Sequence, residues 1–362
     1  MRVLHVMAGA AEGGAESMML DSALALAEAG LPQHVLTRAD NAHRLERLRD
    51  ARIDVTTASF DKLWRMPTAA ALQFCMEQLR PDVLHFWMGR AGSYAPRAWA
   101  DRSLGWYGGY YKLNRFKHCG WHAGVTSDIR RHILEQGAAP ERVVTLPVFT
   151  PIAPAAPVER ASLQTPDEAP VVLALARLHW KKGLDVLLHA LAEMPGVYGW
   201  IAGAGPLETD LHNLSEALGL GDRVRFLGWR NDRAALLAAC DVVAFPSRYE
   251  PFGAVTIEAW AARRPLVVAD AAGPAATVTH EENALLVPRE DASALAAALR
   301  RVLDEGDLAA RLVQNGWRDY QARFTEQAFV RAALALYERM CNAPPLRSQA
   351  SSPDAAALSG AA

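Results

Sequence analysis

The chain has 362 residues, 51% of them hydrophobic, and a formal net charge of −2 at pH 7. This length exceeds what one ordinary core uses and predicts two domains, while the near-neutral charge gives no general case for binding nucleic acid. The four cysteines lie far apart, without the spacing of a zinc site or a disulfide framework. No apolar run approaches the roughly 18 residues that span a bilayer. We therefore expect a cytoplasmic globular protein that at most lies on the inner face of the cytoplasmic membrane.

Strands and helices are predicted to alternate through the first half of the chain. The apolar run at 2–8 is interpreted as a strand and not as a secretory signal, because it is short and leads into a glycine loop at 9–14. Further strands are expected at 34–37, 53–58, 81–87, 123–126 and 143–149, and helices at 16–29, 42–51, 67–79 and 127–137. This alternation is typical of a parallel, doubly wound sheet.

The same alternation restarts after a proline- and alanine-rich stretch at 150–170, which has the composition of a linker. Strands are expected at 171–176, 198–202, 224–227, 242–245, 265–269 and 284–287, with helices between and after them. The sequence thus predicts an α/β protein with two Rossmann-like domains, at 1–149 and 171–323, that face a cleft. A helix at 324–342 is expected to return to the first domain, and the tail at 343–362 is expected to be disordered.

The stretch from Phe245 to Glu258 carries the strongest functional signal. An apolar strand ends here, passes a loop with Glu250 and Gly253, and enters an alanine-rich helix. Free N–H groups at a helix start stabilise an anion such as phosphate, whereas carboxylates repel phosphate and bind hydroxyls. The arrangement suggests a ligand that combines phosphate and sugar. An ordinary strand–helix unit with two solvated glutamates is the alternative.

Two further groups are expected at the same cleft. Arg177 and Lys182 follow the first strand of the second domain, where two cations could hold a diphosphate and stabilise a leaving group. A solvated basic turn is the alternative for this pair. In the first domain, Gly13 and Gly14 place a loop without side chains at a helix start, where backbone can approach a phosphate or sugar.

In chain order these motifs resemble glycosyltransferase family 4. They are Gly-Gly-x-Glu at 13–16, the strand Pro-Asp-Val-Leu-His at 81–85, Arg-Leu-x-x-x-Lys-Gly-x-Asp-x-Leu-Leu at 177–188, Gly-x-Gly-Pro at 203–206, and Pro-Ser-x-x-Glu-Pro-Phe-Gly-x-x-x-x-Glu at 246–258. The resemblance covers about residues 1–340. It implies the GT-B fold and a retaining, hexosyltransferase-type enzyme that uses a nucleotide-sugar donor and needs no metal or other cofactor.

The resemblance also implies a role for each matching residue. Arg177 and Lys182 would hold the donor diphosphate and stabilise the leaving group. Glu258 would accept hydrogen bonds from the ribose, and Glu250 would contact the donor sugar. The remaining donor contacts would come from the backbone of Phe252, Gly253 and Ala254 and from Gly13 and Gly14.

The chain departs from the family pattern at three points. Many members end the fourth strand in His-x-His, whereas the second position here is Trp87, and His85 is offset by two residues. His85 is a candidate catalytic residue, with a core histidine as the alternative. The glycine-rich turn at 273–276 lacks the usual glutamate, and the later Asn-Gly is Asn-Ala at 283–284.

The stretch from 90 to 118 combines six basic residues with several aromatic ones and one acid, Asp101. Such a mixture suits a membrane interface or an anionic, lipid-linked acceptor. A partly buried aromatic loop with a solvated basic face is the alternative. We predict peripheral membrane contact through this stretch and no binding of nucleic acid.

These observations predict a glycosyltransferase that transfers a sugar to an acceptor hydroxyl in lipopolysaccharide or another bacterial envelope glycan. Two alternatives are a sugar-nucleotide epimerase or phosphorylase on the same fold and a non-catalytic protein that binds a sugar nucleotide. The sugar, the base, the acceptor and the oligomeric state are left open.

Overall fold

The computed structural model describes residues 1–10, 13–61 and 63–345. Its N-terminal domain is built on one parallel sheet with the strand order β3-β2-β1-β4-β5-β6-β7. The strands are β1 (Val3–Met7), β2 (Gln33–Thr37), β3 (Asp54–Thr57), β4 (Val83–Trp87), β5 (Ser103–Tyr107), β6 (Trp121–Gly124) and β7 (Val143–Thr145). The helices are α1 (Gly14–Glu28), α2 (Ala42–Asp50), α3 (Met66–Leu79), α4 (Met88–Gly92) and α5 (Ser127–Glu135). The chain reverses its direction of winding between β1 and β4.

Strand β5, which lies within the basic and aromatic stretch at 90–118, was not predicted from the sequence. Strand β5 is fully buried between β4 and β6, and the rings of Trp106, Tyr107 and Phe116 are 0% exposed. Most of the basic side chains of the stretch are exposed instead. The rings of Trp106, Tyr107 and Phe116 therefore belong to the core, which favours the alternative of a partly buried aromatic loop with a solvated basic face.

The C-terminal domain holds a second parallel sheet, in the order β10-β9-β8-β11-β12-β13. Its strands are β8 (Val171–Leu175), β9 (Tyr198–Ala202), β10 (Val224–Gly228), β11 (Val242–Phe245), β12 (Leu266–Ala269) and β13 (Leu285–Val287). Its helices are α6 (Leu184–Ala192), α7 (Glu208–Ala217), α8 (Arg233–Ala239), α9 (Ala254–Ala261), α10 (Ala272–Ala275), α11 (Ala292–Asp304) and α12 (Gly306–Arg323). The strand order reverses between β8 and β11, and such a switch point is where doubly wound sheets bind ligands.

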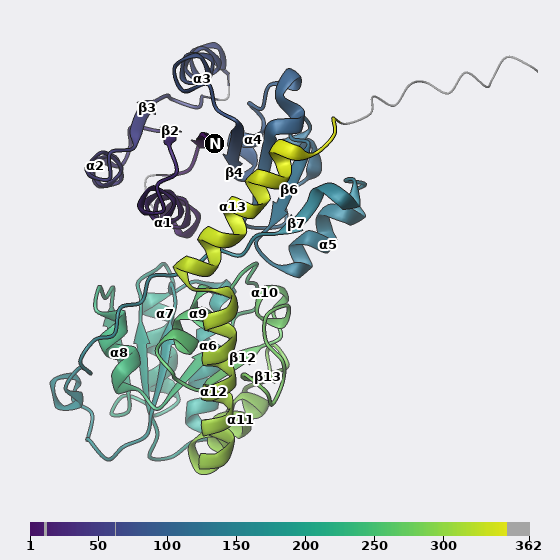
Figure 1. The fold of residues 1–362 in the computed structure, drawn as a ribbon. Coiled ribbons are helices and arrows are strands. Elements are labelled where there is room, and N and C mark those ends of the chain that lie inside the picture. The colour runs from purple at the N-terminus through teal and green to yellow at the C-terminus, as the bar shows by residue number, and fades with distance from the viewer. Residues whose placement is uncertain (11–12, 62, 346–362) are drawn as a thin grey trace, which may run out of the picture.

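The two domains are joined twice. The segment after β7 packs against the C-terminal domain through the 3₁₀ turn η4 (Arg160–Leu163), and the Arg160 guanidinium donates to the carbonyl of Ala239 and to the Asp241 carboxylate. Helix α13 (Glu326–Asn342) crosses back and packs on α1 and β4 of the N-terminal domain (Figure 1). The interdomain geometry therefore depends on both chain crossings.

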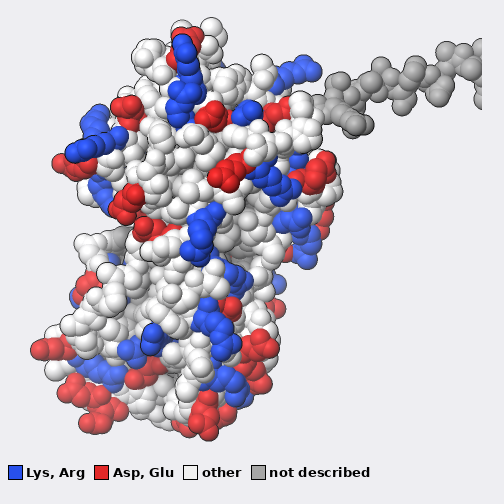
Figure 2. All heavy atoms as spheres, in the orientation of Figure 1, with Lys and Arg blue, Asp and Glu red and all other residues white. Residues whose placement is uncertain are grey.

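The surface shows no broad field of one charge on the face drawn in Figure 2, where basic and acidic side chains are interspersed over the described residues. This matches the near-neutral net charge of the chain. Among the described residues, no helix combines the length and the apolar character needed to cross a membrane.

Candidate active site

Two loops of the C-terminal domain meet at the switch point between β8 and β11. The carbonyl of Lys181 accepts hydrogen bonds from the backbone N–H groups of Arg248, at 2.8 Å, and Tyr249, at 3.2 Å. The Arg248 guanidinium donates two further bonds to the Asp185 carboxylate, at 2.7 and 2.6 Å. These contacts fix the loop after β8 against the loop after β11.

Gly183 allows this close approach. Its φ is +61°, in the left-handed region, and a Cβ at this position would overlap the carbonyl oxygen of Pro246. Glycine adopts this conformation at little cost and leaves room for the neighbouring loop. The position therefore requires glycine both for its backbone angle and for packing, one residue after Lys182.

The clamped loops bring Lys182 and Glu250 together. The Lys182 ammonium forms an ion pair with Oε2 of Glu250, and the two side chains are 26% and 14% exposed. The ammonium also lies 5.9 Å from the centroid of the Phe245 ring at the end of β11. A cation and a carboxylate are thus fixed side by side at the carboxyl edge of the sheet, as the sequence predicted for one binding site.

Helix α9 begins next to this pair. Gly253 precedes the helix with a φ of +91°, and the carbonyl of Glu250 accepts a hydrogen bond of 2.8 Å from the N–H of Gly273. A Cβ at Gly273 would press within 2.6 Å of that carbonyl oxygen. The turn at 273–276, which lacks the family's glutamate, therefore supports the backbone of the loop that carries Glu250.

The N-terminal domain supplies the opposite wall. A pocket of about 250 Å³ lies between the domains. Its lining from the C-terminal domain is Lys182, Phe245 and 250–255, and from the N-terminal domain it is Gly14, Ala15, Met18, Trp106, Gly108 and Val125. The pocket joins Lys182, Glu250, Phe252, Gly253, Ala254 and Gly14 of the predicted site. Four residues of the pocket wall were not predicted from the sequence: Met18, Trp106, Gly108 and Val125. Trp106 could have been indicated only by a correct assignment of β5.

Two predicted residues, Arg177 and Gly13, are not part of the pocket wall. Arg177 is exposed two residues beyond β8, and its guanidinium makes no ion pair with the residues that the structure describes. Gly13 caps α1, and a Cβ there would overlap the carboxylate of Glu16. Glu16 in turn accepts the N–H of Ala10 at 2.7 Å, so its carboxylate lies against both Ala10 and Gly13.

Glu258 lies deeper than Lys182 and Glu250. It is 5% exposed, and its Oε1 is 3.3 Å from the guanidinium of Arg233 at the start of α8. Burial raises the pKa of the Glu258 carboxyl, and the nearby Arg233 opposes this shift. Glu258 is therefore a buried carboxyl group paired with a half-exposed arginine. It does not line the pocket in this structure.

His85 occupies the middle of the first sheet. It is 0% exposed, its Nδ1 lies 2.8 Å from the hydroxyl of Tyr337 in α13, and its ring stacks on Trp87 at 4.4 Å. Burial holds the pKa of His85 well below its usual value, so the ring is neutral. The indole N–H of Trp87 donates to Nδ1 of His5 at 3.1 Å. These contacts make His85 a core residue, which corrects its prediction as a catalytic residue.

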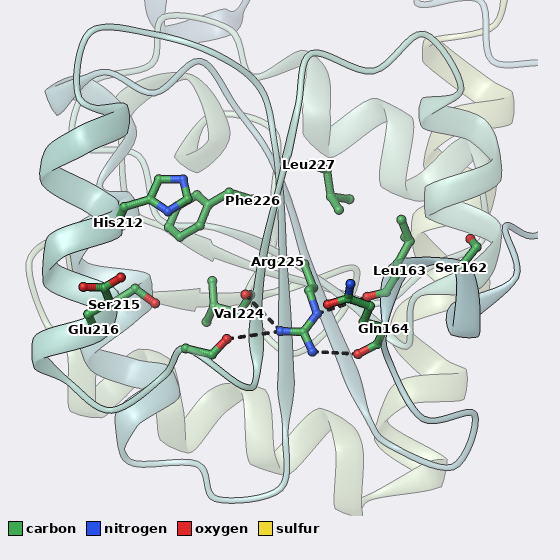
Figure 3. A pocket seen from close by; sticks show the side chains of 11 residues that line it. Ser162, Leu163, Gln164, His212, Ser215, Glu216, Val224, Arg225, Phe226 and Leu227 are labelled. Carbon is green, nitrogen blue, oxygen red and sulfur yellow. Dashed lines mark hydrogen bonds between the residues drawn. The ribbon is translucent and has the colours of Figure 1, made fainter.

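A second hollow, of about 400 Å³, lies away from the cleft, between α7, β10 and the segment after η4 (Figure 3). Its Arg225 guanidinium donates to the carbonyls of Leu163 and Gln164, at 3.1 and 2.6 Å, and to carbonyls of the turn before β10. His212 stacks on Phe226 with ring centroids 4.0 Å apart. Because the Arg225 guanidinium donates to backbone carbonyls on both sides of this hollow, it holds the interdomain segment against the C-terminal domain.

The fold and the cleft together define a GT-B protein. The chain superposes on the crystal structure of HepE from Anabaena in complex with UDP with a TM-score of 0.81 and 22% identity, over 93% of this chain and 100% of that one. Residues 156–319 match the family model described as glycosyl transferases group 1.

Two curated relatives extend the match to nearly the whole chain. The lipopolysaccharide core biosynthesis glycosyltransferase LpsD of Rhizobium meliloti is 34% identical, over 94% of this chain and 98% of the relative. LpsE of the same organism is 32% identical, over 93% and 98%. The chain belongs to this family of glycosyltransferases. The epimerase alternative finds no support in these matches.

Proposed function

We propose that the chain is a retaining glycosyltransferase of family 4 that transfers a hexose from a nucleotide diphosphate sugar to a hydroxyl of lipopolysaccharide core or another envelope glycolipid. One observation carries the proposal. Lys182, Glu250, the start of α9 and Gly14 of the opposite domain converge on a single interdomain pocket. This set supplies a cation and backbone N–H groups for a diphosphate and a carboxylate for hydroxyl groups.

In the proposed reaction, Lys182 and the exposed Arg177 hold the donor diphosphate. As the bond between the anomeric carbon and the phosphate oxygen breaks, negative charge grows on the diphosphate, and the two cations and the N-terminus of α9 stabilise it. No metal is required in this scheme. The diphosphate competes with Glu250 for the Lys182 ammonium, which frees the Glu250 carboxylate to accept hydrogen bonds from the sugar.

Glu258 is proposed to accept hydrogen bonds from the ribose hydroxyls, with the nearby Arg233 favouring the ionised form of its carboxyl. The acceptor hydroxyl then attacks the same face of the sugar that the diphosphate leaves. The proton of that hydroxyl passes to the departing phosphate oxygen, which has become the strongest base in the pocket. The anomeric configuration is thereby retained.

The known proteins support the donor and acceptor classes. HepE was crystallised with UDP and with UDP-glucose, which supports a nucleotide-sugar donor. LpsD and LpsE are named for lipopolysaccharide core biosynthesis, which supports an acceptor of that kind. A cytoplasmic protein on the inner face of the membrane belongs to the same proposal, since donors and nascent glycolipids meet there.

A thermal-shift screen over nucleotide sugars, followed by transfer assays on lipopolysaccharide core fragments, tests the proposal. Lys182→Ala and Glu250→Gln should lose transfer, whereas Lys181→Ala, whose ammonium lies over the ring of Tyr249, serves as the matched control. Turnover should survive chelation of divalent metals, and NMR of the product should show the donor's anomeric configuration. Undiminished transfer by both site variants would refute the site, and donor binding without turnover on any acceptor would favour the non-catalytic alternative.

A further inference from the structure

Large apolar side chains are exposed together at one end of the N-terminal domain. Leu63 is 89% exposed, Trp64 77% and Met66 80%, and Phe74 on the same helix is 53% exposed. Met66 and Phe74 are eight residues apart in α3 and so lie on one helix face. These four residues, which we name the apolar tip, form the largest group among the exposed large hydrophobic side chains of the described residues.

The apolar tip is held in a fixed conformation. The Asp61 carboxylate accepts the N–H groups of Leu63, at 2.7 Å, and Trp64, at 3.0 Å. Arg65 lies over the ring of Tyr94 at 4.1 Å and donates to the carbonyl of Ser93 at 2.6 Å. The Tyr94 hydroxyl donates to the carbonyl of Asp61 at 2.9 Å. The polar groups of Asp61 and Arg65 thus make contacts within the domain while the side chains of Leu63, Trp64 and Met66 are exposed, the opposite of what core packing produces.

Two basic residues, Arg90 and Arg115, lie on or beside the segment that Arg65 contacts. The carbonyl of Arg90 accepts the Ser93 hydroxyl at 2.8 Å, on the segment that holds Arg65. The neighbouring Gly89 packs against the side chain of Arg115. Arg90, Arg115 and Lys117 are all exposed. The acid of the loop, Asp61, is committed to the two backbone N–H groups above.

We propose that the apolar tip inserts into the interface of an anionic lipid bilayer, with Arg90 and Arg115 against the headgroups. Apolar side chains with adjoining cations match the acyl boundary and the negative surface of such a membrane. A second copy of the chain is the less fitting occupant, because a two-fold interface would set the same basic residues against one another. Helix α3 lies at the end of the domain farthest from the C-terminal domain (Figure 1), so insertion leaves the other domain clear of the bilayer.

This inference extends the proposed function, since it names the surface that would bring the cleft to a lipid-linked acceptor. Binding to the bilayer, however, is measurable without donor or acceptor. The basic residues lie in the 90–118 stretch that the sequence singled out, while the inserting side chains lie outside it.

Flotation of the full chain with vesicles tests the inference. One vesicle is pure phosphatidylcholine, and the other contains roughly one third phosphatidylglycerol, which supplies the negative surface. The triple variant Leu63→Ser, Trp64→Ser, Met66→Ser removes the apolar side chains, and Arg90→Glu with Arg115→Glu reverses the charge. The control is Trp229→Ser, which removes another exposed tryptophan, 76% exposed, from the C-terminal domain.

The wild type and the Trp229 variant should float with the anionic vesicles and much less with the neutral ones. Each of the other two variants should lose at least about tenfold in partitioning, and about 0.5 M salt should weaken wild-type binding by screening the charges. Transfer to a water-soluble acceptor should be unchanged in all variants, so a failure of the inference is distinct from a failure of the proposed function. Equal binding by wild type and triple variant would overturn the inference, and so would a wild-type dimer that the triple variant loses.

Discussion

Glu258→Gln is the most informative single substitution, because it keeps the shape of the side chain and removes a buried charge. Burial raises the pKa of the Glu258 carboxyl above its ordinary value of 4.5, and this effect outweighs the opposing effect of Arg233. The folded state therefore disfavours the ionised form, and the wild type loses stability as the pH rises through the raised pKa. Without ligand, the glutamine variant should be as stable as the wild type or more stable at neutral pH. This advantage should vanish below the ordinary carboxyl value.

A bound nucleotide sugar should reverse this order of stability and favour the wild type over Glu258→Gln. Hydrogen bonds from ribose hydroxyls to a carboxylate are worth about 1.5–3 kcal/mol, so their loss raises the Kd roughly 10- to 150-fold. At a donor concentration about 100 times the wild-type Kd, ligand stabilises the wild type by about 2.7 kcal/mol. The same concentration stabilises the variant by only about 0.3–1.4 kcal/mol. Each kcal/mol corresponds to about 2–4 °C in Tm for domains of this size.

Thermal unfolding of both proteins, with and without the best nucleotide sugar, measures the two effects separately. The companion variant Arg233→Gln leaves the buried carboxylate without its ion pair, so it should be less stable than the wild type at neutral pH. An equal ligand-induced shift in wild type and Glu258→Gln would refute the assignment of Glu258 to the ribose. A lower Tm for Glu258→Gln in the absence of ligand would refute the balance between burial and Arg233.

Three further predictions concern other groups. Lys182→Ala should lower kcat/KM roughly a hundred- to thousandfold in steady-state transfer assays, and Lys181→Ala should change it less than about threefold; similar losses in both would contradict the role of Lys182. Gly183→Ala should destabilise the chain in urea unfolding by clearly more than Gly219→Ala. At both positions the alanine would have a positive φ, which costs about 1 kcal/mol, but only at Gly183 would the added Cβ overlap a carbonyl oxygen. Burial lowers the pKa of His5 and His122 to about 4 from 6.5, so stability should fall as the pH drops below 6.5, since the unfolded chain binds those protons first. The slope is about 1.4 kcal/mol per pH unit for each histidine, and His122→Gln should remove its share; an unchanged slope in acid urea titrations would contradict this origin.

The local elements of this protein could be predicted from its sequence. The alternation of strands and helices predicted two doubly wound sheets, because each element's periodicity is written within its own residues. The positions of Lys182, Glu250 and Gly253 at one edge of the second sheet could also be predicted. Each lies a few residues beyond a strand, and parallel strands deliver their carboxyl ends to one edge.

Which side chains are buried, and against which neighbours, depends on the packing of the folded chain. Strand β5 has the short sequence Ser-Leu-Gly-Trp-Tyr and is buried on both faces, so it lacks the polar alternation that marks a half-exposed strand. His85 is a core residue because α13 folds back over β4. This places Tyr337, 252 residues further along the chain, against His85. The pairing of Glu258 with Arg233 and the exposure of Leu63, Trp64 and Met66 likewise depend on neighbours distant in sequence. Burial is a property of the whole packed chain, and no local pattern contains it.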